Sequence, residues 1–269
     1  MTSGRDPNVD PFVQDALHNK GYLYSTNAQL SSRLANRRIT DVTLDIADLR
    51  RKRVLDIGCG DGMFTQELVE LGESVTVHGV DPAVAALAVA RSKVHDPRLQ
   101  FVVSSAYHLP YPDDCFDAAH LRGVLHHMND PIQALREALR VAGVVVVIEP
   151  NGYNPGLKVL ERCSRYHVEH GEKSYAPWRL ERWIGDLGAR IERRTWAGLV
   201  PMFSPDWCAK AMKRLEPVVE QVPVLRAGVC AVFAFTAIRV RGRGGSDVSH
   251  PASGPSASSE AGRGQAGQQ

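Results

Sequence analysis

Val54-Leu55-Asp56-Ile57-Gly58-Cys59-Gly60-Asp61-Gly62 joins a short apolar run to three closely spaced glycines. A continuous apolar run of this length is typical of a strand that is buried on both faces of a parallel sheet. Glycines at the end of a strand let the backbone turn sharply and let a ligand approach the main-chain amides. The stretch therefore predicts a strand, a ligand-binding turn and a helix that begins after Gly62.

Strands and helices are predicted to alternate through the first half of the chain. Four further apolar runs have the same character: VTVHGV (75–80), LQFVVS (99–104), CFDAAHL (115–121) and VVVVIE (144–149). Apolar residues between the runs recur at helical spacing, and Asp130 precedes Pro131 as the N-cap of one such helix. This alternation predicts an α/β fold with right-handed crossovers.

The second half of the chain is less regular. PWRLERWIGDLGA (177–189) predicts an amphipathic helix, ARIERRTWAG (189–198) a strand, SPDWCAKAMKRLEPVVEQV (204–222) a helix that breaks near Pro217, and GVCAVFAFTAIRV (228–240) the final strand. The four tryptophans are expected to lie in the core: Trp178, Trp183, Trp196 and Trp207.

Composition predicts one folded domain between two disordered ends. The expected parts are a disordered N-terminus (1–10), the domain (11–240) with a cofactor half at about 50–150 and substrate-lid insertions at about 150–176 and 197–227, and a disordered tail (241–269). The tail is rich in Gly, Ser, Ala, Pro and Gln, so it cannot bury enough apolar surface to offset its chain entropy.

Charge and cysteine content exclude several classes of partner. Lys and Arg number 32 and Asp and Glu 30, which disfavours a nucleic-acid partner, because such proteins need a basic stripe. The longest apolar run, Val144–Ile148, is far too short to span a bilayer, so no membrane partner is expected. The N-terminus lacks a secretory apolar region and the five cysteines form no CxxC pair, which predicts a reduced, cytoplasmic protein without a metal site.

Two acidic residues indicate what the turn binds. The second apolar run ends in Val80-Asp81-Pro82, and an acid at this place can accept hydrogen bonds from a ribose diol. The third glycine of the turn comes one residue earlier than in the dinucleotide fingerprint GxGxxG. Asp56 would repel a pyrophosphate but would attract a ligand that carries an ammonium group.

Four motifs in order resemble one family. Asp56-x-Gly58-x-Gly60-x-Gly62, Val80-Asp81, Ala106-x-x-Leu109-Pro110 and Phe116-Asp117 resemble the class I S-adenosylmethionine-dependent methyltransferases, nearest the small-molecule group that includes the ubiquinone and menaquinone enzymes. The resemblance covers about residues 50–150. It implies a Rossmann-like sheet of seven mostly parallel strands with helices on both faces and an antiparallel last strand. It also implies S-adenosylmethionine as cofactor and methyl transfer to O, N or C of a small molecule, with a place in secondary metabolism among the possibilities.

The resemblance also assigns residues to the cofactor. The turn would lie under the methionine part with Asp56 near its ammonium, and Asp81 would hold the ribose hydroxyls. Ser105 would lie at the adenine edge, where many relatives carry Asp. The implied cofactor residues are Asp56, Gly58, Cys59, Gly60, Gly62, Asp81, Pro82, Ser105, Ala106, Arg122 and Gly123.

Candidate catalytic residues follow the fourth and fifth predicted strands. His126 and His127 come after the fourth strand and Glu149 ends the fifth, so all three are expected at the ligand edge. A neutral histidine near pH 7 can take a proton from the methyl acceptor, although loop capping or packing would explain the same residues. The residues expected to contact the acceptor are Tyr24, Tyr153, His167 and His170.

Two other functions remain open. The fold could bind S-adenosylmethionine without catalysis, as a sensor or as the partner subunit of another enzyme. An NAD(P)-dependent oxidoreductase uses a similar sheet, but the glycine spacing and Asp56 disfavour it. The acceptor, the methylated atom and the oligomeric state do not follow from the sequence.

Overall fold

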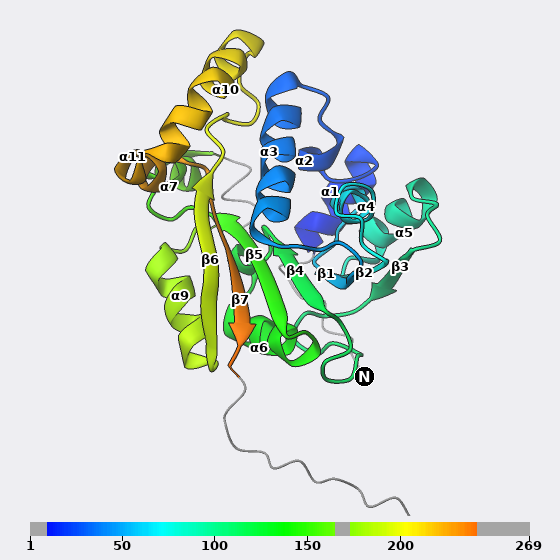
Figure 1. Ribbon diagram of the computed structural model, residues 1–269. Helices are drawn as coiled ribbons and strands as arrows, with labels where there is room; N and C mark the ends of the chain where they lie inside the picture. Colours follow the sequence, from blue (N-terminus) through cyan, green and yellow to red (C-terminus); the bar gives the residue numbers. More distant parts are fainter. Residues whose placement is uncertain (1–9, 165–172, 241–269) are drawn as a thin grey trace, which may run out of the picture.

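The computed structural model describes residues 10–164 and 173–240. Within them seven strands form one sheet in the order β3-β2-β1-β4-β5-β7-β6 (Figure 1). The strands are β1 (Arg53–Ile57), β2 (Thr76–Asp81), β3 (Leu99–Val103), β4 (Ala118–Arg122), β5 (Val144–Pro150), β6 (Ala189–Ala197) and β7 (Val232–Arg239). Strands β1 to β5 are parallel, whereas β7 is antiparallel to both β5 and β6. The α/β class and the antiparallel last strand are confirmed.

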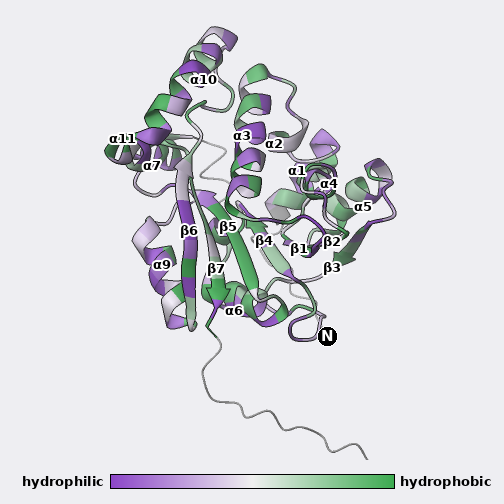
Figure 2. Ribbon diagram, viewed as in Figure 1, coloured by the Kyte–Doolittle hydropathy of each residue, from purple (hydrophilic) through white to green (hydrophobic). Residues whose placement is uncertain are grey.

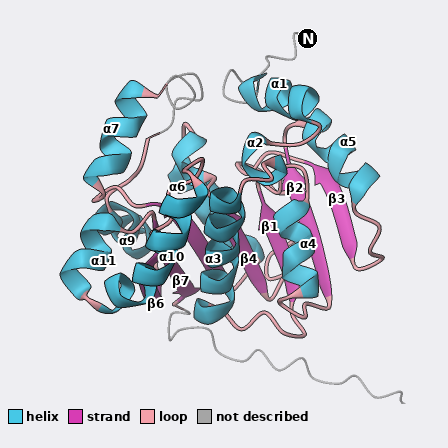
Figure 3. Ribbon diagram, turned by 90° about the horizontal axis from the view of Figure 1, so that it is seen from above, coloured by secondary structure: helices cyan, strands magenta, loops and turns pink. Residues whose placement is uncertain are grey.

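Helices lie on both sides of this sheet, as the view from above shows (Figure 3). They are α1 (Asp10–Asn19), α2 (Leu23–Thr26), α3 (Leu30–Ile46), α4 (Met63–Glu70), α5 (Val84–Lys93), α6 (Pro131–Val141), α7 (Pro155–Cys163), α9 (Pro177–Asp186), α10 (Asp206–Gln221) and α11 (Pro223–Val229), with a 3-10 turn η1 (Leu125–His127). None of the helices in the described part of the chain is both long enough and apolar enough to cross a membrane.

The sheet is buried on both faces by two apolar clusters. Leu55 of β1 belongs to one cluster with Leu135 of α6 and Ile184 of α9. Its neighbour Val54 belongs to the other cluster, with Val42 of α3. Successive side chains of a strand point to opposite faces, so an unbroken apolar run fills both clusters at once. The inner strands are accordingly hydrophobic along most of their length (Figure 2).

The N-terminal helices are not apparent in the apolar pattern of the sequence. Helix α3 is 17 residues long, yet much of its buried side is polar, including Ser31, Ser32, Asn36, Thr40 and Thr43. Thr40 and Asn36 accept hydrogen bonds from Arg122 of β4. The helix covers a charged residue of the sheet, so its inner face lacks the apolar periodicity by which helices are recognised.

Two expectations about elements in the second half of the chain are wrong. Helix α10 continues through Pro217 and ends only before Pro223. Beyond Pro217, Glu220 of the same helix pairs with Arg38 of α3 at 2.6 Å. Residues 223–229 form α11, so the last strand begins at Val232.

Two of the four tryptophans are also not in the core. Trp183 is buried, and the ring of Trp196 packs on Phe233 with centroids 5.0 Å apart. Trp178 and Trp207, however, are 55% and 75% exposed. Apolar spacing alone does not reveal which side of a helix faces the protein.

Candidate functional site

The turn between β1 and α4 lies at the carboxyl edge of the sheet and has three glycines in the left-handed region. Gly58, Gly60 and Gly62 have φ angles of 76°, 55° and 78°. A Cβ on Gly60 would lie 2.4 Å from the ring of Tyr22, and a Cβ on Gly62 would lie 2.8 Å from the ring of Phe101. The turn therefore requires glycine both for its backbone angles and for its close contacts.

Asp81 ends β2 beside this turn, and its side chain is buried. Its Oδ2 accepts a hydrogen bond from the Gly60 N–H at 3.0 Å, and its Oδ1 accepts one from the Ala83 N–H at 2.8 Å. Burial raises the pKa of the Asp81 carboxyl to about 6, although the two amide bonds act in the opposite direction. The carboxylate is therefore held rigidly against the glycine turn, with lone pairs left for further donors.

Asp56 lies beneath the turn, and both of its oxygens have partners within the protein. Oδ1 lies 2.8 Å from Nδ1 of His120 in β4, and Oδ2 accepts a hydrogen bond from the Thr65 hydroxyl of α4 at 2.6 Å. The β1–β4 register pairs Asp56 with His120, which explains why residues 64 positions apart meet. Any effect of Asp56 on a ligand above the turn is therefore transmitted through the backbone that it anchors.

Arg122 extends from the end of β4 toward α3 and α4. Its guanidinium group lies 3.6 Å from the centre of the Phe64 ring and donates to the Thr40 hydroxyl at 2.8 Å and the Asn36 carbonyl at 3.1 Å. Burial lowers the pKa of Arg122 to about 10. The next residue, Gly123, has a φ of 64° and donates its N–H to the carbonyl of Ile148 at 2.7 Å.

A segment of α1 and α2 covers the glycine turn. Asp61 accepts hydrogen bonds from the Tyr22 N–H at 3.2 Å and from the Ser25 hydroxyl. The Tyr22 ring rests on Gly60, and burial, followed by the charge of Asp81, raises the pKa of its hydroxyl. The cover therefore places the Tyr22 ring over the backbone of Gly60, which has no side chain.

Glu149 organises the loop that carries the two candidate histidines. Its fully buried carboxylate accepts hydrogen bonds from the N–H groups of Val124, Leu125 and His126 at 2.8 to 3.2 Å. It also lies 2.8 Å from Nδ1 of His126. The carboxylate is thus occupied by four protein donors, which favours a positioning role over that of a base.

His126 and His127 lie together after β4. Their ring centroids are 3.8 Å apart, and the ring of Phe12 in α1 meets His127 edge to face at 4.8 Å. The N-terminal cover thus contacts both the glycine turn and the histidine loop. Of the other expected acceptor residues, Tyr24 packs against Phe203 with ring centroids 5.9 Å apart, and Tyr153 is exposed. His167 and His170 lie outside the described residues.

The remaining predicted cofactor residues lie around the ends of β1, β2 and β3. Cys59 is buried within the turn, and burial raises the pKa of its thiol. Pro82 is exposed after Asp81, and Ala106 is buried. Ser105 is exposed after β3, and its hydroxyl accepts a hydrogen bond from the Tyr107 N–H at 3.2 Å.

Three residues of the site are not singled out from the sequence, namely Asp61, Thr65 and His120, whereas the Tyr22–Tyr24 stretch is expected from the resemblance to supply a lid residue or to pack on a helix face. Asp61 stands inside the glycine motif, and its acidic character is the signal that could have identified it. The partners of Asp56 and the ring over Gly60 depend on strand register and on the path of the N-terminal segment.

The sequence of residues 55–146 matches the family model described as a methyltransferase domain. The chain is 33% identical over 227 residues to a 27-O-demethylrifamycin SV methyltransferase of Amycolatopsis mediterranei, with 79% of both proteins covered. It is 35% identical over 116 residues to a demethylmenaquinone methyltransferase of Lysinibacillus sphaericus, covering 41% of this chain and 50% of that protein. The chain spans between a quarter and a half of the length of the first three curated relatives that it matches.

Solved structures share the fold at low sequence identity. A putative methyltransferase in complex with the Trm112 methyltransferase activator of Haloferax volcanii superimposes with a TM-score of 0.64 at 15% identity, covering 89% of this chain and all of that one. The [4+2]-cyclase SpnF superimposes with a TM-score of 0.61 at 22% identity, covering 87% and 93%. Likeness at such identities concerns the fold, which can host different chemistries.

Proposed function

Since the chain belongs to the class I S-adenosylmethionine-dependent methyltransferases, we propose that it transfers the methyl group of S-adenosylmethionine to a small-molecule acceptor. The observation that carries the proposal is the buried Asp81 carboxylate, fixed beside a glycine turn at the carboxyl edge of the sheet. The match to a methyltransferase over 79% of both chains supports it.

The residues present fit S-adenosylmethionine. Asp81 offers carboxylate lone pairs to a ribose diol. Gly60 has no side chain, so an aromatic ring, that of Tyr22, can rest on its main chain. The glycine turn brings no cation that would oppose a sulfonium, because the Arg122 guanidinium is held toward α3. We assign Gly58, Gly60, Gly62 and Asp81 to cofactor binding, and Asp56 to holding the turn from below.

When bound, the cofactor supplies an activated methyl group, so the protein mainly orients the acceptor and keeps water away. We assign proton removal to the His126–His127 pair. Glu149 next to Nδ1 of His126 favours the tautomer with hydrogen on Nδ1, which makes Nε2 the basic nitrogen of the neutral ring. Glu149 is then a positioning residue that fixes this ring and the η1 backbone.

The acceptor that we propose is a hydroxyl-bearing secondary metabolite with apolar surface. A hydroxyl needs a base, which the histidine pair can supply. The facing rings of Tyr24 and Phe203 offer apolar contact at the edge of the site. The relative that is matched over 79% of its length is named a 27-O-demethylrifamycin SV methyltransferase, and this name describes methylation of an oxygen.

Calorimetric titration with S-adenosylhomocysteine, with NADH as the control ligand, tests the cofactor assignment. We expect micromolar binding of the first ligand and none of the second. Asp81→Asn should weaken binding, whereas Asp96→Asn, which removes a half-buried carboxylate paired with Arg98, should not. Binding of NADH alone would assign the site to hydride chemistry instead.

Transfer of labelled methyl to a panel of hydroxylated metabolites tests turnover separately from binding. His127→Ala should reduce turnover while S-adenosylhomocysteine still binds. Full cofactor binding without transfer to any acceptor would favour the non-catalytic alternative.

A further inference from the structure

Helix α10 is amphipathic, but charged residues lie on the side that faces the protein and apolar residues on the side that faces solvent. Its protein-facing side carries Glu216 and Glu220, which pair with Arg38 of α3. Both carboxylates also hold the loop before the helix, since Glu216 accepts from the Leu199 N–H at 3.0 Å and Glu220 from the Gly198 N–H at 2.9 Å. The buried residues of the helix are the small apolar Ala209 and the charged Glu216, so charged and polar contacts carry much of an attachment that is normally apolar.

The outward side of α10 is apolar. Trp207, Ala211, Leu215, Val218 and Val222 follow one another at helical spacing, and all five are exposed. The exposed fractions of Trp207 and Val218 are 75% and 62%. An apolar stripe of this length that faces water marks a surface that meets an apolar environment.

Helix α11 continues the stripe around the corner of the molecule. Val224 is 82% exposed and Leu225 is 47% exposed. Figure 1 shows α10 and α11 at the outer edge, beyond β6. The stripe, defined here as Trp207, Leu215, Val218, Val222, Val224 and Leu225, is thus exposed along both helices.

Basic side chains border the stripe along the side that faces α3. Lys210, Lys213 and Arg214 line a hollow of about 320 Å³ whose other walls are Leu30 and Leu34 of α3. Lys213 pairs with Glu216. Lys210 and Arg214 have no ion-pair partner among residues 10–164 and 173–240, so two cations remain uncompensated beside an apolar floor.

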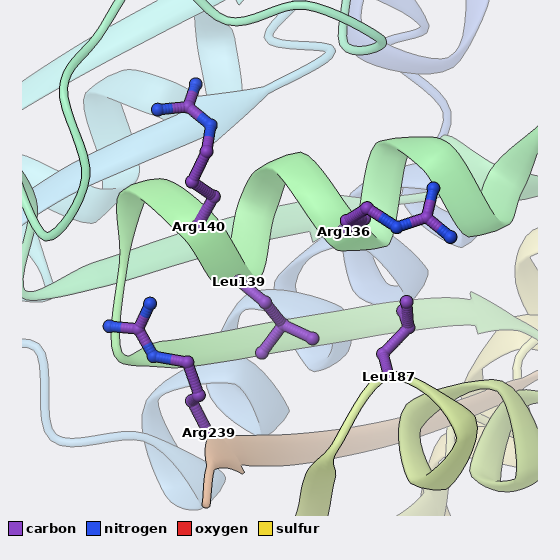
Figure 4. A pocket seen from close by; sticks show the side chains of 5 residues that line it. All are labelled: Arg136, Leu139, Arg140, Leu187 and Arg239. Carbon is purple, nitrogen blue, oxygen red and sulfur yellow. The ribbon is translucent and has the colours of Figure 1, made fainter. Parts of the chain in front are cut away.

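A second surface hollow differs in this respect. It measures about 190 Å³ at the opposite edge of the sheet and is lined by Arg136, Leu139, Arg140, Leu187 and Arg239 (Figure 4). Arg140 is paired with Glu137 and Asp113, and Arg239 with Asp114. Arg136 donates a hydrogen bond to the neutral Gln133, so two of the three arginines of this hollow are neutralised by carboxylates.

We propose that α10 and α11 form a docking surface for a membrane that carries anionic headgroups. The stripe would enter the boundary between headgroups and acyl chains, with Lys210 and Arg214 facing the lipid phosphates beside the hollow. Charge complementarity favours this occupant over a second copy of the chain, because a two-fold contact would bring two sets of unpaired cations together. The expectation of no membrane partner rests on the lack of a segment that could span the bilayer. Binding to the membrane surface needs no such segment.

Vesicle co-sedimentation of the full chain tests the proposal. The vesicles are phosphatidylcholine alone, or phosphatidylcholine and phosphatidylglycerol in equal parts. We expect binding to the anionic vesicles that weakens with salt, and little binding to the neutral ones. Reversal of both cations in Lys210→Glu/Arg214→Glu should reduce binding by at least about tenfold, and Trp207→Ser/Val224→Asp should abolish it.

The matched control is another amphipathic helix, α9. Trp178→Ser and Arg182→Glu change an exposed tryptophan and an exposed arginine outside the stripe, and binding should be unchanged. Far-UV circular dichroism and S-adenosylhomocysteine affinity report whether each variant is folded. Absence of binding by the folded protein to anionic vesicles would overturn the proposal. So would a dimer in sedimentation velocity that Trp207→Ser/Val224→Asp dissociates, since the stripe would then cover a second copy.

Discussion

Asp81 combines burial with two amide hydrogen bonds, and the cofactor role that we propose for it predicts that cofactor binding depends on pH. Burial raises the pKa of Asp81 from 3.8 to about 6, so the carboxyl takes up a proton as the pH falls through about 6. The protonated group loses its charge and part of its acceptor capacity, so it binds a ribose diol less strongly. We therefore expect the affinity for S-adenosylhomocysteine to fall below pH about 6 in calorimetric titrations.

The stability effect of Asp81 has the opposite sign. The folded protein holds this proton more tightly than the unfolded chain between pH 3.8 and about 6, so the group's contribution to stability decreases as the pH rises through that window. Asp81→Asn should remove both the affinity step and this stability term. An unchanged affinity step in the variant would assign it to another group, such as the neighbouring Asp61.

The pair of Asp56 and His120 should matter for stability more than for direct ligand contact. His120→Leu leaves a buried carboxylate with Thr65 as its one side-chain partner, which should lower the free energy of unfolding by about 3 kcal/mol. The double variant Asp56→Leu/His120→Leu removes both polar groups and should recover part of this loss. Urea denaturation measures both effects, and equal losses in the single and double variants would contradict the pairing.

At the residue scale, the sequence predicts what is local and misses what is brought together by folding. The glycine turn and Asp81 are each contained in a few consecutive residues, and both lie where the motifs place them. The His120 partner of Asp56 and the Tyr22 ring over Gly60 come from segments 64 and 38 positions away, so only the sheet register and the path of the N-terminal helices reveal them. Glu149 stands at the expected edge, but its four donors favour a role that residue type alone does not predict.

Among the elements, the α1–α2 cover depends on Gly60. Gly60→Ala would place a Cβ 2.4 Å from the Tyr22 ring in a backbone region that alanine rarely adopts. We expect displacement of the cover, faster proteolytic cleavage near residues 20–29 and at least about tenfold weaker cofactor binding. Gly143→Ala is the matched control, because a Cβ there meets nothing within 4 Å. Equal protease sensitivity of the two variants would show that the cover does not rest on Gly60.

Helices whose buried side is apolar can be predicted from the sequence, whereas the buried sides of α3 and α10 cannot. The inner side of α3 is largely polar because Arg122 lies beneath it, and the inner side of α10 is acidic because Arg38 lies opposite. In both helices an arginine elsewhere in the chain determines which residues are buried. Patterns based on apolar spacing cannot contain this information.

For the whole molecule, β7 is the element on which the sheet depends. It lies between β5 and β6 and contributes Phe233 and Phe235 to the apolar cluster beneath α6 and α9. A chain that ends after Cys230 loses both rings, each worth about 3–5 kcal/mol, which is comparable to the whole stability of a domain. We expect this chain to lose cooperative thermal unfolding, whereas a chain that ends after Val240 should keep both its unfolding transition and cofactor binding. Cooperative unfolding of the shorter chain would show that β1 to β5 suffice.

The central position of β7 also sets an order of events during synthesis on the ribosome. The five parallel strands that carry the glycine turn and Asp81 have all been made by residue 150, while Val144 must wait for Ile238 as its partner on the far side. The nascent chain thus has its cofactor-binding half before the sheet can close. A cofactor present at that moment would stabilise the half-made domain by mass action, so the metabolite supply of the cell can influence the yield of folded protein.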